Sequence, residues 1–296
     1  MTQSLHLRAR DPDSNGYTVD ISPASAGWTY SSLRVVVLAP GTTLDWTTDG
    51  SEWIVLPLAG SCTVTCGDER FDLEGRTSVF ERVSDFAYVP RASSVSVHSE
   101  LGGRFALAGA LAHNVLPARY GRAEDVPVEL RGAGSSSRQC INFASPEGFE
   151  TDHLVAVEIL VPGGNWASYP PHKHDEVRPG EAQLEEIYYF EVRGGAKSGE
   201  PGPGAYQRVY SSGPDRQIDL LVEVATGDAI LIPFGYHGPT MASPGYDLYF
   251  LNVLAGPAEE RTMAFCDDPT HAWLRESWRG IEIDPRLPMT SSRGVL

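Results

Sequence analysis

The stretch that decides the fold is PHKHDEVRPGEAQLEE, residues 171–186. His172 and His174 are two positions apart, so on a β-strand both imidazoles point to the same face. Glu186 closes the stretch and opens the apolar run IYYF. Two imidazoles and a carboxylate that stand next to a strand are typical ligands of a divalent transition metal.

A fourth ligand candidate ends a second apolar run, GDAILIPFGYH, whose last residue is His237. Isolated histidines are usually structural, but this ordered set between strand-like runs is much more specific. Three neutral imidazoles and one carboxylate can hold a metal ion and leave coordination positions open. The sequence therefore predicts a metal site made of His172, His174, Glu186 and His237. The neighbouring Glu185 remains an alternative for the carboxylate ligand.

The order of these residues resembles the two sequence motifs of cupins. Two features depart from the common pattern. The segment between His174 and Glu186 is longer than usual and rich in Pro, Gly and charge, so we expect a loop at the mouth of the site. A single residue separates Gly235 from His237, where the common pattern has two.

Composition also favours an all-β fold. The chain has 296 residues, enough for one large or two ordinary domains, and its 30 Gly and 22 Pro punctuate short apolar runs. The net charge of −16 disfavours binding to nucleic acid or to anionic membrane surfaces. We expect a small-molecule substrate, and the sequence leaves open whether the chain forms a homo-oligomer.

The four cysteines and the N-terminus indicate a cytoplasmic protein. Cys62 and Cys66 share one face of an alternating strand and have no Cys/His cluster near them, so we expect buried free thiols. The first residues lack the apolar segment of a signal peptide, and no apolar run approaches the 18 residues of a membrane span.

Three ordered matches between the two halves of the chain indicate an internal duplication. They align residues 36–41 with 158–163, 52–60 with 186–194, and 84–94 with 227–237. We therefore predict two tandem cupin β-sandwich or barrel lobes, residues 1–139 and 140–296. The long apolar strand before Pro257 belongs to the second lobe, and the C-terminal tail, with helix-like spacing, is expected to cover an open sheet edge.

The duplication fails where the chemistry would lie. Ser94 stands in the position of His237, and Thr47 and Asp49 stand in the region of the two paired histidines. Glu52 is matched with Glu186, but one carboxylate with hydroxyls does not hold a transition metal tightly. The first lobe is predicted to be a metal-free partner and the second lobe to be catalytic.

Several motifs of the second half together resemble the 5-deoxy-glucuronate isomerase family of myo-inositol catabolism. They are PHKHD, LEEIYYF, QRVY, GDAILIPFGYH, GYDLYFLNVLAGP and DPTHAW, within about residues 155–275. The resemblance implies a bicupin related to 4-deoxy-5-ketouronate isomerases, in which the equivalent His, His, Glu and His hold zinc. It implies conversion of 5-deoxy-D-glucuronate to 5-dehydro-2-deoxy-D-gluconate. Zinc is the expected ion, with manganese, iron or nickel as alternatives.

Isomerisation of an aldose to a ketose moves a proton from C2 to C1 through an enediolate that a divalent ion would stabilise. A general base whose pKa lies near neutrality must reach C2. Glu185 and Glu176 lie close to the ligands in sequence, and Tyr188 shares a strand face with Glu186. These three residues are the candidates for the catalytic base.

The substrate also carries a carboxylate, which Arg can bind through two parallel hydrogen bonds. Arg208 alternates with tyrosines on a strand of the second lobe, and we predict that it binds this carboxylate. Tyr236 and Tyr249 are expected to line the pocket. Two other functions remain open, because cupins reuse one site for unrelated chemistry: a metal-dependent dioxygenase and a non-catalytic sugar-binding or storage protein.

Overall fold

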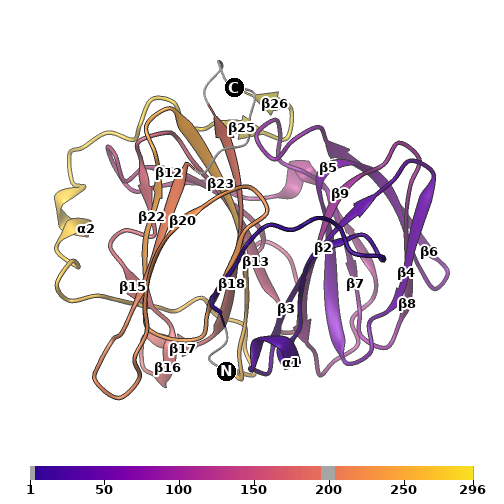
Figure 1. Cartoon of the computed structure of the whole chain (residues 1–296), viewed down its shortest axis with the longest axis horizontal. Coiled ribbons are helices and arrows are strands. Elements are labelled where there is room, and N and C mark those ends of the chain that lie inside the picture. Colours follow the sequence, from indigo (N-terminus) through magenta and orange to yellow (C-terminus); the bar gives the residue numbers. More distant parts are fainter. Residues whose placement is uncertain (1–3, 195–203, 296) are drawn as a thin grey trace.

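The computed structural model describes residues 4–194 and 204–295. Within these residues the chain is almost entirely β-structure, with two four-residue helices, α1 (Pro23–Ala26) and α2 (Leu274–Ser277). Two lobes of curled antiparallel sheets lie side by side (Figure 1). This arrangement confirms the predicted all-β bicupin fold. No helix in the described part of the chain is long and apolar enough to cross a membrane.

The first lobe is one nine-stranded sheet that curls around its own apolar interior. Its longest strand, β5, pairs with β6 and β8 near its end and with β7 and β9 near its start, with a bulge between Pro57 and Ala59. The strands of this lobe are β2 (Tyr17–Ile21), β3 (Ser31–Leu38), β4 (Thr42–Thr47), β5 (Ser51–Cys66), β6 (Glu69–Arg76), β7 (Phe86–Val89), β8 (Ser94–Ser99), β9 (Gly103–Leu111) and β10 (Arg119–Gly121).

The second lobe is built from two facing sheets. The seven-stranded sheet runs in the order β1 (His6–Leu7), β21 (Ala229–Ile232), β18 (Glu185–Gly194), β23 (Tyr246–Ala255), β13 (Val155–Val161), β12 (Arg138–Ala144) and β11 (Val128–Arg131). The six-stranded sheet contains β20 (Asp219–Val224), β19 (Ala205–Tyr210), β22 (Tyr236–Ala242), β15 (His172–Lys173), β24 (Cys266–Asp267) and β14 (Trp166–Ala167). The predicted loop at the mouth of the site is a short hairpin, β16 (Asp175–Arg178) and β17 (Glu181–Gln183).

The seven-stranded sheet is buried on both faces, and its two faces contact two different apolar cores. On β18, Ile187 and Tyr189 belong to the core between the lobes, whereas Tyr188 and Phe190 belong to the interior of the second lobe. Because successive strand residues face opposite sides, adjacent residues of β18 serve different cores. The same alternation applies to β23, where Tyr249 faces the first lobe.

Strand pairing places the connection between the lobes earlier than the predicted boundary at residue 139. β10 pairs with β7 of the first lobe, whereas β11 and β12 both pair within the seven-stranded sheet of the second lobe. The chain therefore crosses between Gly121 and Val128, through the 3-10 turn at Ala123–Asp125. The N-terminal β1 also pairs with β21 of the second lobe, so the division of the chain is not strictly sequential.

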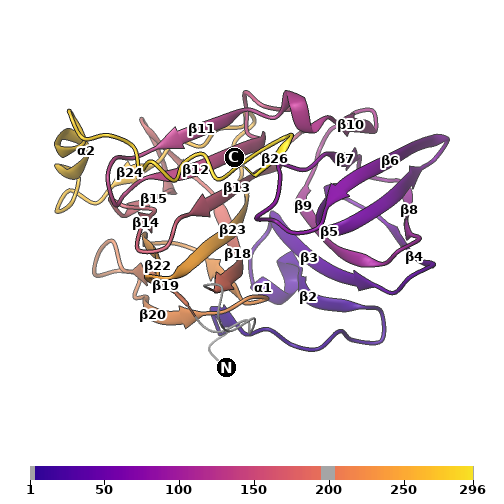
Figure 2. The same cartoon turned by 90° about the horizontal axis from the view of Figure 1, so that it is seen from above.

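The C-terminal tail covers a sheet edge, as its sequence predicts. β24 pairs with β15 at the end of the six-stranded sheet. The helix-like spacing corresponds to α2, which is only one turn long. Beyond α2 the tail returns across the molecule to β25 (Thr290–Ser291) and β26 (Gly294–Val295), close to the first lobe (Figure 2).

Candidate metal centre

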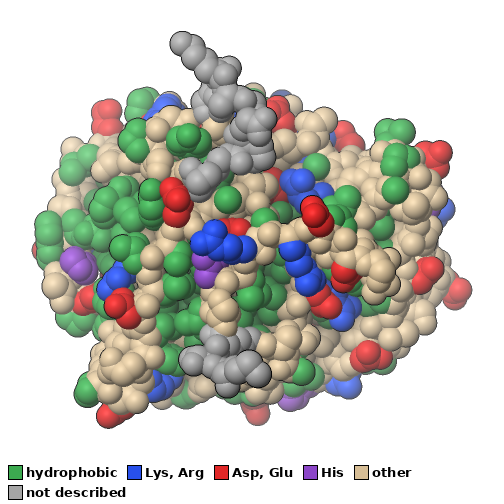
Figure 3. Space-filling model, in the orientation of Figure 1, with side chains coloured by type: hydrophobic (Ala, Val, Ile, Leu, Met, Phe, Trp, Pro, Cys, Tyr) green, Lys and Arg blue, Asp and Glu red, His purple; other side chains and the backbone are tan. Residues whose placement is uncertain are grey.

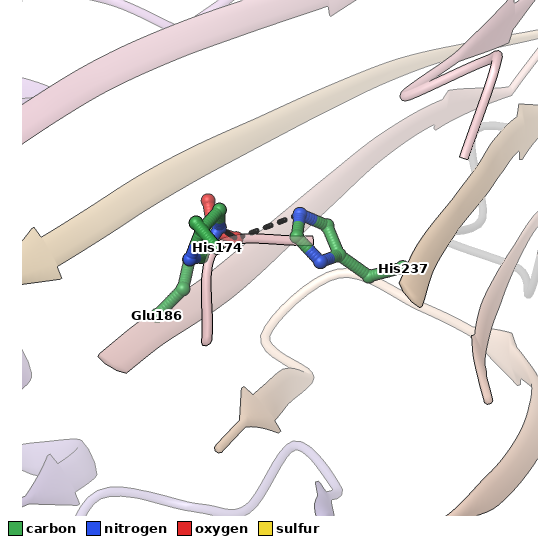
Figure 4. Close-up of side chains that lie close together, drawn as sticks. All are labelled: His174, Glu186 and His237. Carbon is green, nitrogen blue, oxygen red and sulfur yellow. Dashed lines mark hydrogen bonds and ion pairs between the residues drawn. The ribbon is translucent and has the colours of Figure 1, made fainter. Parts of the chain in front are cut away.

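Three of the four predicted ligands converge in the interior of the second lobe. An oxygen of the Glu186 carboxylate, Oε2, lies 3.0 Å from Nε2 of His174 and 3.1 Å from Nε2 of His237 (Figure 4). All three side chains are buried. In residues 4–194 and 204–295 no other group of three His, Cys, Asp or Glu side chains brings its ligand atoms as close together.

The fourth predicted ligand, His172, lies beside this group. Its ring centroid is 4.4 Å from that of His237 and 6.3 Å from that of His174. The register of β15 and β22 sets His172 directly opposite His237, while Glu186 comes from the facing sheet. The structure thus brings together all four residues that the sequence predicts as ligands.

A buried ion-pair network holds the strand of the candidate ligands in place. Lys173, between His172 and His174, points away from the centre, and its Nζ lies 2.6 Å from Asp175 and 2.7 Å from Glu181. Asp175 also accepts a hydrogen bond of 2.8 Å from the backbone N–H of Gly235, two residues before His237. The network therefore connects both segments that carry the histidines.

The unbonded nitrogens of His237 fit a metal ion. His237 is fully buried, and within the described residues its Nδ1 has no hydrogen-bond partner, while its Nε2 meets only the Glu186 carboxylate, without the geometry of a hydrogen bond. Buried polar atoms without a partner are rare in proteins. Burial lowers the pKa of His237 and of His172, which favours the neutral imidazoles that a metal requires. Burial alone would raise the pKa of Glu186, but His237 and His174 lower it to about 2, so this ligand is anionic.

The cluster opens into a cavity of about 570 Å³. Tyr188 lines this cavity, and its hydroxyl lies 3.2 Å from that of Ser168. Asn252 also lines it, with a buried Oδ1 that makes no hydrogen bond within the described residues. The cationic side chains on its wall are Arg131, Arg138 and Arg275. The cavity thus offers polar and cationic groups next to the candidate metal ligands.

Of the three candidate bases, only Tyr188 lines the cavity. Glu185 faces the first lobe, where its carboxylate accepts hydrogen bonds from the backbone N–H groups of residues 29–31, at 2.6 to 2.9 Å. Glu176 is exposed on the hairpin and lies 3.3 Å from Lys173. The assignment of a base role to Glu185 and Glu176 was therefore wrong, because strand alternation turns Glu185 away and Glu176 lies outside the cavity.

The residues that we predicted to bind substrate also lie outside the cavity. Arg208 is partly exposed on the outer surface of β19, 2.9 Å from Asp219. Tyr236 packs against Tyr210, with ring centroids 5.6 Å apart. Tyr249 faces the first lobe and donates a hydrogen bond of 2.7 Å to Glu158. These placements correct the three predictions.

The sequence-based argument missed the arginines of the cavity. Arg138 begins β12, and it shares one face of that strand with Cys140 and Asn142, which also line the cavity. The predicted boundary at residue 139 places Arg138 at the very end of the first lobe, so the sequence gives no expectation that Arg138 and the run after it form a wall of the site. The alternation of RQCIN was the available clue.

Comparison of strand registers corrects the alignment of the lobes. The alignment of residues 84–94 with 227–237 matches Val89 with Ile232. Trp53 pairs with Val89 in the first lobe, and Glu186 pairs with Ile232 in the second. The first-lobe counterpart of Glu186 is therefore Trp53, and Glu52 corresponds to Glu185. The sequence match of Glu52 with Glu186 was wrong by one residue, although Glu186 is the carboxylate that meets the histidines.

Residues 5–274 match the family model of the KduI/IolB family. The chain belongs to this family. It is 40% identical over 277 residues to the 5-deoxy-glucuronate isomerase of Geobacillus kaustophilus, which covers 92% of this chain and 96% of that protein. It is 35% identical over 269 residues to the 5-deoxy-glucuronate isomerase of Bacillus subtilis, which covers 89% of this chain and 95% of that protein.

Solved structures agree with this assignment. An IolB-like protein from Salmonella typhimurium superposes with a TM-score of 0.83 at 32% identity, covering 92% of this chain and 99% of that chain. The oxalate decarboxylase of Lactobacillus farciminis superposes with a TM-score of 0.62 at 14% identity, covering 90% of this chain and 89% of that chain. The second likeness shows the shared bicupin fold alone.

Proposed function

We propose that this protein is an aldose–ketose isomerase of inositol catabolism that converts 5-deoxy-D-glucuronate to 5-dehydro-2-deoxy-D-gluconate. Membership of the family and identity to named isomerases over most of the chain support this function. The observation that carries it is the buried group of His174, Glu186 and His237, which opens into a cavity lined by arginines. Such a cavity suits a small anionic sugar.

We propose that His172, His174, Glu186 and His237 hold one divalent transition metal, with zinc as the ion. Bound there, it would act as a Lewis acid that polarises oxygens of the substrate. The donor set of imidazoles and a carboxylate suits zinc, and an isomerisation needs no redox chemistry. Lys173 and Asp175 would keep the ligand segments in register.

The side chains of the cavity would orient the sugar. Burial raises the pKa of Tyr188 well above its usual value, so its hydroxyl stays protonated and can donate a hydrogen bond to a substrate oxygen. Ser168 contacts that hydroxyl and would fix its direction. Asn252 offers a carbonyl oxygen that could accept a hydrogen bond from a sugar hydroxyl.

We also propose a cytoplasmic location. All four cysteines are free. Cys62 and Cys66 are buried as the sequence predicts, and Cys140 is also buried. Free thiols are typical of reducing compartments.

On the face drawn in Figure 3, Lys and Arg side chains are scattered among acidic ones and form no continuous basic surface.

The test is conversion of 5-deoxy-glucuronate by the purified, metal-loaded protein, followed by NMR and mass spectrometry. An isomerase gives a product of unchanged mass, at the same rate under argon and in air. Turnover in D2O should introduce deuterium at C1 to the extent that the transferred proton exchanges with solvent. A strict requirement for O2, or a gain of oxygen mass, would assign the protein to the dioxygenases instead.

A further inference from the structure

Three arginines line the cavity, and two of them are already neutralised. Arg131 makes two hydrogen bonds to Glu129, from Nε at 3.2 Å and from Nη2 at 2.6 Å. Arg275 forms a similar two-point pair with Asp267, in which Nη2 lies 2.8 Å from Oδ1. Each of these cations has a carboxylate partner of its own in the protein.

Arg138 differs from both. Its Nη1 donates one hydrogen bond of 3.0 Å to the backbone carbonyl of Ser136, and its guanidinium lies 5.9 Å from the centre of the Trp278 ring. Within the described residues, no carboxylate lies within ion-pair distance of Arg138, and its Nε and Nη2 make no hydrogen bond. A guanidinium has five N–H donors, so most of them remain available to a ligand.

This arrangement is costly for the protein alone. Arg138 is only 6% exposed, and its register partner across the strand pair is Arg131, a like charge. Buried charges without a partner and like charges that face each other across strands both destabilise a fold. Burial lowers the pKa of Arg138 to about 10, which still leaves it cationic at neutral pH. Sites that lower stability in this way are expected where a ligand supplies the missing charge.

Arg138 and the candidate metal ligands belong to one cavity wall. The face of the seven-stranded sheet that lines the cavity carries Arg138 on β12, Asn252 on β23 and Glu186 on β18. His172 and His174 line the same cavity. A molecule bound in this cavity can therefore contact both Arg138 and the candidate metal ligands.

We propose that Arg138 binds the carboxylate of the uronate substrate through its free guanidinium edge, while the aldehyde end lies toward His174, Glu186 and His237. The inference rests on the proposed function. Arg131 and Arg275 keep their own carboxylates and orient the surrounding wall. Trp278 covers one face of the Arg138 guanidinium and restricts its plane, which favours two-point binding over a mobile cation.

The test compares two substrates that differ only at C6. One is 5-deoxy-glucuronate, and the other is the neutral aldose with a primary alcohol in place of the carboxylate. Arg138→Met should lower kcat/KM for the acid by about 10- to 100-fold and leave the neutral aldose nearly unchanged, because hydrogen bonds to charged groups are worth that factor. Arg138→Lys should recover part of the loss, since it restores charge without the fork.

Arg208→Met is the matched control, because Arg208 is a cation of the same lobe outside the cavity. It should leave both rates unchanged. Equal losses on the two substrates in Arg138→Met, or an unchanged rate on the acid, would overturn the assignment. Metal content should equal that of the wild type, and the unfolding temperature of the free variant should not fall, because the substitution removes an unpaired buried charge.

A binding measurement separates this assignment from the proposed reaction. The C1 alcohol obtained by reducing 5-deoxy-glucuronate keeps the carboxylate and cannot isomerise. It should bind to the wild type and raise its unfolding temperature, and it should bind at least 10-fold more weakly to Arg138→Met. If the wild type binds this acid at least 10-fold more tightly than Arg138→Met does but does not isomerise the aldehyde, the proposed function fails and Arg138 stands. If the wild type isomerises and both proteins bind the acid equally, Arg138 fails and the function stands.

Discussion

The two lobes present the same scaffold with different interiors. His172 lies opposite His237 in the second lobe, and Thr47 lies opposite Ser94 in the first. The position of Glu186 is taken in the first lobe by Trp53. A carboxylate and imidazoles on one side, and hydroxyls and an indole on the other, share one backbone register. The backbone of this fold therefore does not determine the chemistry of a lobe.

The position just before Trp53 and Glu186 carries a glutamate in both lobes, Glu52 and Glu185, and the two have the same role. Glu52 accepts hydrogen bonds from the backbone N–H groups of residues 152–154, just before β13. Glu185 accepts hydrogen bonds from those of residues 29–31, at the start of β3. Each carboxylate thus fastens the lobe opposite to its own. The position that faces the other lobe has kept one structural function, while the next position, which faces the interior, has diverged.

The largest expected effect comes from removing an imidazole of the second lobe. His237→Ala should lose the metal and lower turnover by about 1000-fold or more, because a Lewis acid contributes several kcal/mol to such a reaction. Ser94→Ala changes the corresponding position of the first lobe and should leave metal content and turnover unchanged. Elemental analysis and kinetics check both. Full metal occupancy in His237→Ala would contradict the assignment of the centre.

The next effect concerns Trp53, which packs in the interior of the first lobe at the position that Glu186 has in the second. A Cβ at Gly109 would lie 2.5 Å from the Trp53 ring, whereas the corresponding Leu254 of the second lobe lines the cavity. Trp53→Ala should lower the free energy of unfolding by about 3 kcal/mol or more, through loss of burial and creation of a cavity. Denaturant unfolding measures this.

Two results accompany the Trp53 prediction. Metal content should be unchanged, because the centre belongs to the other lobe. Trp166→Ala, at a partly exposed tryptophan of the second lobe, should have a much smaller effect on stability. Equal losses from the two substitutions would mean that Trp53 is not the packing element of the first lobe.

The adjacent carboxylates of β18 provide a sharper comparison. Glu185→Gln should weaken hydrogen bonds to three backbone N–H groups and lower the free energy of unfolding by about 1 to 3 kcal/mol, with metal content unchanged. Glu52→Gln should behave in the same way. Glu186→Gln should instead lose the metal. Loss of the metal in Glu185→Gln, with retention in Glu186→Gln, would reverse the two roles.

Much of the fold could be predicted because β-structure leaves local traces in sequence. Apolar alternation and Gly/Pro punctuation predicted the bicupin fold, and the spacing of His172, His174 and His237 predicted the candidate centre, since these histidines lie in short segments. The boundary at residue 139 was wrong because a Gly/Ser-rich turn inside a sheet resembles a linker. Which strands pair across it depends on contacts distant in sequence.

The rest of the site depended on which face of a strand turns inward. Arg208 and Arg138 are both arginines on strands of the second lobe, but only Arg138 faces the cavity. In a sheet buried on both sides, Glu185 and Glu186 are equally plausible as ligands, because both faces carry apolar neighbours. A shift of one residue in the alignment of the lobes exchanged their counterparts. Tertiary pairing was needed to choose between them.

The smallest effect concerns the protons of the metal-free centre. Burial lowers the pKa of His172 and His237, whereas Glu186 raises the pKa of His174 against the opposing effect of burial. The free site should therefore keep a proton on His174 to higher pH than on the other two imidazoles, and metal binding below the raised pKa should release about one proton. This proton stabilises the metal-free fold below the unfolded pKa of histidine, and its contribution is lost as pH rises through the raised pKa.

Metal affinity should accordingly fall by about tenfold per pH unit on the acid side of that pKa, and more steeply once the other imidazoles are protonated. Calorimetric titration of the metal-free protein with Zn²⁺, in buffers of different protonation enthalpy, counts the released protons. Ser94→Ala should give the wild-type count, and release of two or more protons just below the raised pKa would show that His172 or His237 is charged before the metal binds.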